Sequence, residues 1–328
     1  MKVSFSAIIA AIFCMLFWGF SFISTKIVAA VFPPMSIGAL RFAAAIVILF
    51  VIRRLVLTKK GAAAAHISRE KFEGGDIPYL AGAGISGVTL YFFFENNGLT
   101  LITASEASII TAAIPVLMIA AEWGADIYAR RVRKQGANPH RPVPYKQWLG
   151  ALVSMTGVWL VAQVSFSSPS GGSGGMNTIL GYLCMGGAAL SWVVYSFLTR
   201  PLFSRHSRLF IIYWQSVFGF FGFVPFALLE IPQWGVVNIP IIFHLSFLGF
   251  CCSALAYWLY AKSMENLGLS LSSLFINLIP VVTVIAGFFV LNERLKGTQW
   301  LGAVLVLAGV YFAVTVKDGG RPCSVGKG

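Results

Sequence analysis

Ten apolar stretches of about twenty residues run through the chain, and this pattern constrains its fold more than any other feature. A helix needs about 20 mostly apolar residues to cross a bilayer. Charged residues make up only 11% of the 328 residues, against about 25% in soluble domains. The composition excludes a soluble globular domain and predicts an all-α integral membrane protein. The expected spans cover residues 5–31, 34–52, 78–99, 105–123, 147–164, 179–198, 209–229, 240–261, 269–291 and 299–316.

The positions of the basic residues predict how these spans are oriented. A net charge of +13 is also found in nucleic-acid-binding proteins, but here the basic residues lie in short runs between spans rather than on one solvated face. With a cytoplasmic N-terminus, 20 of the 24 Lys and Arg residues lie inside, and only Lys26, Arg294 and Lys296 lie outside. Cytoplasmic loops are enriched in such residues. We therefore expect a multi-pass protein of the plasma (cytoplasmic) membrane, with both termini cytoplasmic, its first span retained and no nucleic-acid partner.

An internal repeat divides the ten spans into two groups of five. QWLGA opens the last span of each half, at 147–151 and 299–303, and Ile-Pro-Val recurs at 114–116 and 279–281. LFWGFSFISTK at 16–26 likewise corresponds to LSWVVYSFLTR at 190–200. We predict a first five-helix repeat over 5–164, a Gly/Ser-rich linker over 165–177, a second repeat over 178–317 and a short cytoplasmic tail over 318–328. Five spans per copy is an odd number, so the second copy is inverted, an arrangement typical of secondary transporters with a site near the bilayer midplane.

Several short motifs, in order and at the right spacing, resemble the drug/metabolite transporter superfamily and its EamA-like exporters. They are Phe-Trp-Gly at 17–19, the stretches 91–116 and 278–295, and a Gly-Ala-x5-Gly-Val element ending each half. The second half has Glu-Arg-Leu at 293–295, where the first half reads EWGADIYARR instead. The resemblance implies ten transmembrane helices in two inverted repeats. It also implies secondary-active export, by alternating access, of small organic metabolites such as amino acids or drugs.

The resemblance leaves the cargo open, because other members of the superfamily exchange nucleotide sugars or sugar phosphates. A channel or a membrane enzyme is a less favoured reading, since the spans contain no cluster of His, Asp or Cys and the chain has no Walker-type phosphate loop. We expect no enzyme activity, no cofactor and no metal site. The expected partners are a small-molecule substrate and the lipid bilayer, with the protein a monomer or a homodimer.

Charged residues inside spans are costly and are functional candidates by default. Arg41 lies about two turns into the second span, Glu95 near the end of the third, and Glu106 at the start of the fourth. Arg41 could bind a substrate carboxylate, and Glu95 or Glu106 could take up a proton in a coupled cycle. A structural ion pair between helices is the alternative interpretation.

Aromatic and polar residues inside the spans are further cavity candidates. In the first and sixth spans they recur at i, i+4 and i+7, which places each set on one helical face. Packing between helices would explain the same pattern without any role in binding. Pro115 and Pro280 occupy equivalent positions and predict two helix bends. The cavity candidates besides Arg41 are Trp18, Phe22, Thr25, Tyr91, Trp192, Tyr195, Ser196, Gln215, Tyr257 and Asn277.

Overall fold

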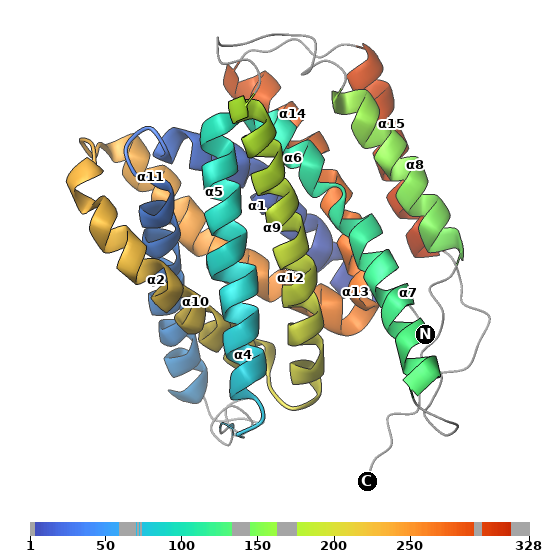
Figure 1. Ribbon diagram of the computed structural model, residues 1–328, viewed down its shortest axis with the longest axis horizontal. Coiled ribbons are helices and arrows are strands. Elements are labelled where there is room, and N and C mark those ends of the chain that lie inside the picture. Colours follow the sequence, from blue (N-terminus) through green and yellow to red (C-terminus); the bar gives the residue numbers. More distant parts are fainter. Residues whose placement is uncertain are drawn as a thin grey trace.

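The computed structural model describes residues 4–58, 70, 72, 74–132, 145–162, 176–291 and 297–315, and every regular element in these ranges is helical (Figure 1). The first half comprises α1 (Phe5–Val28), α2 (Pro34–Thr58), α4 (Ile77–Gly84), η1 (Ile85–Leu90), α5 (Tyr91–Leu101), α6 (Ala104–Thr111), α7 (Ile114–Val132) and α8 (Tyr145–Ala162). The second half comprises α9 (Met176–Thr199), η2 (Arg200–Ser204), α10 (Arg208–Glu230), η3 (Ile231–Gln233), α11 (Ile239–Phe247), η4 (Leu248–Leu255), α12 (Ala256–Leu267), α13 (Leu269–Leu274), η5 (Phe275–Asn277), α14 (Leu278–Leu291) and α15 (Gly297–Thr315).

These elements form ten successive helical crossings, as the hydropathy pattern predicts. Eight continuous helical stretches are long and apolar enough to span a bilayer, and α8 and α15 complete the two halves. Large apolar side chains such as Phe13, Leu183, Phe221, Phe243 and Tyr311 are exposed on the outer surface, which is the arrangement that a lipid solvent requires. The predicted all-α membrane fold is confirmed. The linker at 165–175, the basic loops at 59–69 and 133–144, and the predicted tail lie outside the described residues.

The two halves pack on each other in a reciprocal way. In the first half α1 packs against α12 and α14, which belong to the third and fourth crossings of the second half. In return, α9 packs against α5 and α7, which belong to the third and fourth crossings of the first half. The last helices, α8 and α15, lie side by side at one edge of the bundle (Figure 1). Each half therefore completes the core of the other, as expected for two inverted copies.

Two glycines at equivalent positions allow the halves to approach closely. When the two half-sequences are aligned on Pro115 and Pro280, Gly84 corresponds to Gly249. When they are aligned on the paired tryptophans, Arg41 corresponds to Gln215. A Cβ atom on Gly84 would lie 2.6 Å from the carbonyl oxygen of Gln215, and one on Gly249 would lie 3.2 Å from that of Arg41. Small residues let membrane helices approach this closely. The same contact is thus made twice, once from each half.

The third crossing of each half contains a π-helical segment, η1 or η4, at corresponding positions. The wider turn of a π-helix interrupts regular α-helical pairing and is frequent at functional sites. In η1 the carbonyl of Gly87 accepts a hydrogen bond from the Tyr257 hydroxyl at 2.8 Å. In η4 the carbonyl of Cys252, the equivalent position, accepts one from Trp18 Nε1 at 3.1 Å. Both π-helical segments therefore bind a side chain from the other half.

The fourth crossings are interrupted near the two repeated prolines. In the first half α6 ends at Thr111 and α7 begins at Ile114, one residue before Pro115. In the second half the short 3-10 turn η5 separates α13 from α14, which begins two residues before Pro280. A proline removes one backbone donor and disfavours a continuous helix before it. The predicted helix bends at Pro115 and Pro280 stay predictions.

Candidate functional site

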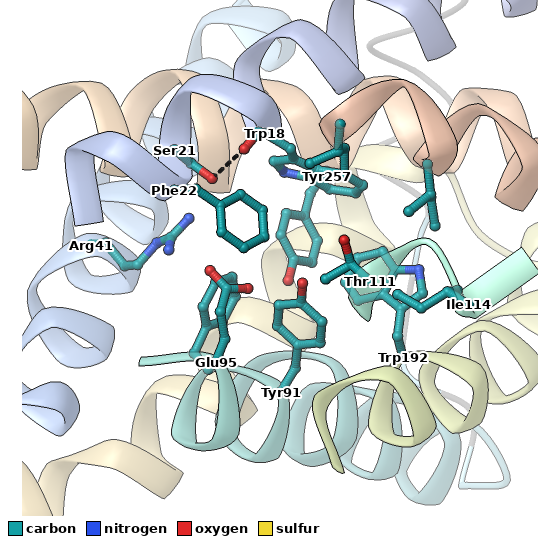
Figure 2. A pocket seen from close by; sticks show the side chains of 13 residues that line it. Trp18, Ser21, Phe22, Arg41, Tyr91, Glu95, Thr111, Ile114, Trp192 and Tyr257 are labelled. Carbon is teal, nitrogen blue, oxygen red and sulfur yellow. Dashed lines mark hydrogen bonds between the residues drawn. The ribbon is translucent and has the colours of Figure 1, made fainter. Parts of the chain in front are cut away.

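A small cavity lies at the centre of the bundle, where helices of both halves meet (Figure 2). Its volume is about 20 Å³, which is space for about one water molecule. The structure is therefore closed around this site. The side chains that line the cavity are Trp18, Ser21, Phe22, Arg41, Tyr91, Phe92, Glu95, Thr111, Ile114, Trp192, Tyr257, Ile276 and Ile279.

Aromatic rings form one wall of the cavity. The equivalent residues Trp18 and Trp192 meet edge to face, with centroids 5.1 Å apart and ring planes at 90°. Tyr257 packs against both, at 5.8 and 5.7 Å, and Tyr91 lies 5.1 Å from Trp192. Such pairs contribute roughly 0.5–1.5 kcal/mol each beyond burial. The hydrogen bond from Trp18 to the carbonyl of Cys252 fixes the orientation of one ring in this wall.

Arg41 forms the positive part of the lining. Its side chain is fully buried, and its Nε donates a hydrogen bond of 2.8 Å to the hydroxyl of Ser253 in η4. The guanidinium carbon lies 4.1 Å from the ring centroid of Phe92, a distance that favours a cation–π interaction. Among the described residues its Nη1 has no hydrogen-bond partner. Arg41 is thus held by one side of its guanidinium, which leaves a donor for a ligand.

Glu95 provides the negative part of the lining. Its side chain is 2% exposed, and Figure 2 shows its carboxyl group facing Arg41 across the cavity. Tyr91, one turn earlier on α5, directs its hydroxyl toward the same region. The structure therefore brings the predicted Arg41 and Glu95 together. It places Glu106 elsewhere: its carboxylate accepts hydrogen bonds from the backbone and hydroxyl of Thr103, which caps α6, and from Tyr182.

Two further aromatic candidates lie at or next to the cavity. Phe22 lines it directly, whereas Tyr195 is fully buried behind it. The Tyr195 ring packs 4.8 Å from Trp192 and 6.0 Å from Tyr257. Tyr195 therefore supports the aromatic wall from behind.

The remaining polar candidates are buried outside the lining. Ser196 donates to the carbonyl of Trp192 in its own helix at 2.9 Å, and Gln215 Nε2 donates to the Thr199 hydroxyl at 2.9 Å. Asn277 donates to the hydroxyl of Ser154, and Thr25 is fully buried. A part for these residues in binding stays a prediction.

Sequence reasoning missed several polar groups at the cavity. Ser253 holds Arg41, and Ser21 and Thr111 line the cavity. The signal available for Ser253 was indirect: a buried arginine needs an acceptor, and a serine inside an apolar span is one. Nothing in the sequence pairs these two residues, which are 212 positions apart.

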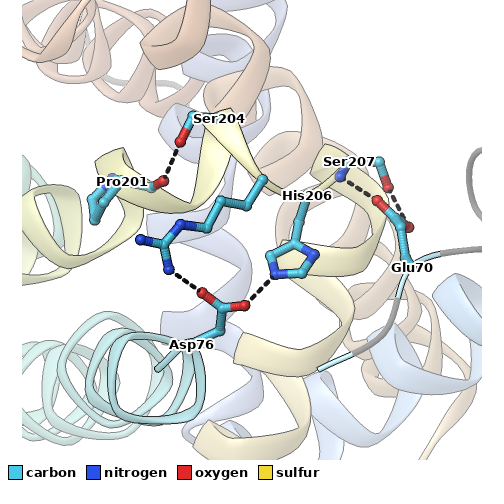
Figure 3. A network of polar contacts seen from close by, with 7 residues as sticks. Glu70, Asp76, Pro201, Ser204, His206 and Ser207 are labelled. Carbon is cyan, nitrogen blue, oxygen red and sulfur yellow. Dashed lines mark hydrogen bonds and ion pairs between the residues drawn. The ribbon is translucent and has the colours of Figure 1, made fainter. Parts of the chain in front are cut away.

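A polar network joins the halves at the end of the bundle where α4 begins and α9 ends (Figure 3). Asp76 is fully buried and accepts bonds from Arg205 Nη1 at 2.7 Å and His206 Nε2 at 2.8 Å. Beside it, Glu70 accepts bonds from the backbone and hydroxyl of Ser207. Burial by itself raises the pKa of Asp76, but the hydrogen bonds from His206 and Arg205 outweigh burial and hold this pKa below its ordinary value. The carboxylate form is thus stabilised by the folded structure.

The opposite end of the bundle is closed mainly by contacts to backbone groups. Lys26 Nζ donates to the carbonyls of Leu99 and Ile102 at 2.6 and 2.8 Å. Glu230 accepts from the backbone amide and hydroxyl of Ser36 at 2.7 and 2.9 Å, at the start of α2. Polar contacts thus close the structure on both sides of the central cavity.

Comparisons with known proteins cover nearly the whole chain. The sequence model of the EamA-like transporter family matches residues 5–125 and 179–315. A protein of Archaeoglobus fulgidus named uncharacterized transporter is 28% identical over 91% of this chain and 93% of its own. A protein of Escherichia coli named probable amino-acid metabolite efflux pump is 25% identical over 52% of this chain and 58% of its own. A solved crystal structure shares the fold with a TM-score of 0.68 and 19% identity, over 94% of this chain and 96% of the other.

Proposed function

The chain belongs to the EamA-like transporter family, and from this premise we propose that it is a secondary-active exporter of small organic metabolites that works by alternating access. The central cavity is its cargo site. The observation that carries the proposal is the position of this cavity between the two halves. It is lined by α1, α2, α5, α6 and α7 of the first half and by α9, α12, η5 and α14 of the second. Inverted halves around one site are the arrangement by which transporters open alternately to the two sides of the membrane.

The lining supports amino acids and related compounds as cargo. Arg41 offers a donor suited to a carboxylate, and the aromatic wall suits an apolar side group. The Escherichia coli relative named as an amino-acid metabolite efflux pump is in line with this cargo. Exchange of nucleotide sugars or sugar phosphates is the alternative. It calls for several cations, whereas Arg41 is the one cation among the described lining residues.

The distribution of basic residues supports cytoplasmic termini in the plasma membrane, with 20 of 24 on the inner side. In that orientation the network around Asp76 closes the cytoplasmic end and Lys26 the outer end. If export is driven by protons, Glu95 is the better placed carboxyl group, because it lines the cavity whereas Glu106 caps α6.

Reconstitution in liposomes tests the proposal. We expect saturable flux of amino acids in protein-containing vesicles and its loss in empty vesicles, with a change in rate when a pH gradient is applied if transport is proton-coupled. Strict exchange of nucleotide sugars would favour the alternative cargo. Conductance that does not saturate would contradict a transporter.

A further inference from the structure

We propose that Arg41 and Glu95 together select cargo by net charge, so that the site accepts zwitterions and rejects organic anions and cations of the same shape. In this arrangement the cargo carboxylate bonds to Nη1 of Arg41 and the cargo ammonium group pairs with Glu95. The inference rests on the proposed transport function. It adds that Glu95 excludes carboxylates that have no ammonium group.

The fold uses only part of the hydrogen-bonding capacity of Arg41, which leaves the rest for a ligand. Among the described residues its side chain makes one hydrogen bond, from Nε to Ser253, and one face of its guanidinium rests on Phe92. These contacts fix the plane of the guanidinium of this cavity-lining residue and leave its Nη1 without a hydrogen-bond partner. A buried charged donor without an acceptor is unfavourable, so a carboxylate entering the cavity would find a strong binding partner.

Glu95 lies on the facing wall and is not bonded to Arg41. Both side chains line the same cavity, and no hydrogen bond joins them in the described part of the chain. A purely structural ion pair would bring the two groups into direct contact, because the attraction of two buried charges offsets their desolvation only at short range. The two groups thus face the same cavity without bonding to each other, an arrangement in which a bipolar ligand can bind to both once the site opens (Figure 2).

Charge balance then decides which cargo can be enclosed. When Glu95 is ionised, its charge cancels that of Arg41, and the described lining contains no further charged side chain. In the closed cavity an uncompensated charge is strongly unfavourable, because it has lost its hydration. A zwitterion adds no net charge, whereas a carboxylate alone or an amine alone leaves one charge unbalanced. The corresponding positions of the second half, Gln215 and Tyr260, are uncharged and supply no counter-ion.

Two isosteric ligand sets test this inference in proteoliposomes. Each set contains an amino acid, its deaminated acid and its decarboxylated amine: leucine with 4-methylpentanoate and 3-methylbutylamine, and phenylalanine with 3-phenylpropionate and phenethylamine. For the wild type we expect each amino acid to compete for flux at least about 10-fold more tightly than its two analogues, as expected for the loss of one charged hydrogen bond. In Glu95→Gln the preference should shift at least about 10-fold toward the deaminated acids, and in Arg41→Gln toward the amines.

Glu106→Gln is the matched control, because it removes a carboxylate from a helix cap and should leave the ranking of the three ligands unchanged. If Arg41→Gln fails to assemble, Glu95→Gln decides alone. If Glu95→Gln weakens competition by all three ligands in the same proportion, the inference is overturned. It is also overturned if the wild type binds none of the three or prefers a charged analogue. Saturable flux of some other solute would then leave the proposed function standing, whereas no saturable flux of any solute would contradict that function itself.

Discussion

The first half places Arg41 and Glu95 at the central cavity, whereas the second half has Gln215 and Tyr260 at the corresponding positions. Gln215 bonds to Thr199, and Tyr260 packs against both central tryptophans, 5.2 Å from Trp18 and 5.4 Å from Trp192. The features that build the scaffold, namely the paired tryptophans, the π-helical segments and the glycine contacts, occur in both halves. The two charges occur only once. The second half builds the same scaffold without these charges, which supports their assignment to the proposed cargo site.

The largest expected effect comes from making the first half like the second. Arg41→Gln should lower amino-acid flux by roughly 10- to 100-fold, because one charged hydrogen bond contributes about 1.5–3 kcal/mol. Gln215→Met, a change at the equivalent position of the second half, should lower it by no more than about 5-fold, since a neutral hydrogen bond contributes about 1 kcal/mol. Initial rates in proteoliposomes with equal protein content measure both. Equal losses in the two variants would mean that the halves contribute alike.

The shared glycine contacts are expected to be of similar strength in both halves. Gly84→Ala and Gly249→Ala should each lower the free energy of unfolding by about 1–3 kcal/mol, because the new methyl group meets the opposite helix. The effect should be larger at Gly84, where the Cβ would lie 2.6 Å from a carbonyl oxygen. Gly186→Ala is the control, since nothing lies within 4 Å of its Cβ position, and it should stabilise by up to about 1 kcal/mol through helix propensity. Thermal unfolding in detergent measures all three, and a neutral Gly84→Ala would refute the close contact.

A charged contact lies at the start of the third crossing of the first half, and a neutral one lies at the start of the third crossing of the second half. Asp76 precedes α4 and bonds to Arg205 and His206, whereas Asn238 caps α11 through the amide of Ile241 at 3.1 Å. Asp76→Asn should lower stability by about 1–2 kcal/mol, since Arg205 is 48% exposed and solvent weakens its attraction. Asn238→Ala should cost about 1 kcal/mol through loss of the cap.

Only the charged contact should depend on pH. Because the folded-state pKa of Asp76 is lowered, its stabilisation is complete above the unfolded-state value of about 3.9 and is lost as pH falls through the folded-state value. The difference in Tm between wild type and Asp76→Asn should therefore stay constant from pH 8 to pH 5 and shrink below about pH 4. A difference that disappears already near pH 6 would show that another group controls it.

The smallest effects concern Lys26 and Arg200, which occupy equivalent positions at opposite ends. Both side chains are exposed, but Lys26 bonds to two helix-end carbonyls, whereas Arg200 pairs with the carboxylate of Glu122 at 3.1 Å. Lys26→Met should cost about 1 kcal/mol, and Arg200→Met about 0.5 kcal/mol or less. Measuring the free energy of unfolding in low and in high salt distinguishes the two losses, because salt screens the ion pair of Arg200 and Glu122. A larger loss at Arg200 would reverse this comparison.

Much of the fold could be predicted because the bilayer imposes simple rules on the sequence. Span length gives the ten crossings, and the odd number of spans per repeat makes the second half inverted. Arg41 and Glu95 could be singled out for the same reason, since a charge inside a span is too costly to be incidental. Their position on facing walls required the structure, because hydropathy does not show which helices are neighbours.

The polar faces of the first and sixth spans were less predictable. Regular spacing places Ser196 on the face of Trp192, but its hydroxyl bonds to the carbonyl one turn earlier, the usual choice of a serine within a helix. The π-helical segments leave no periodic signature in sequence, and each one shifts the face that the following residues present. Tyr91 follows η1 directly, Tyr257 follows η4 after Ala256, and both line the cavity.

The opposite charges of Arg41 and Glu95 also bear on energy coupling across the membrane. A charge moved across a potential of 100 mV gains or loses about 2.3 kcal/mol, so a carrier with one unbalanced charge would return empty at a rate set by voltage. With both charges in one site, neither the empty carrier nor one loaded with a zwitterion carries net charge from this pair. While Glu95 stays ionised, the membrane potential would then neither drive nor retard the cycle through this pair, whereas uptake of a proton by Glu95 would add one positive charge and make the cycle sensitive to voltage.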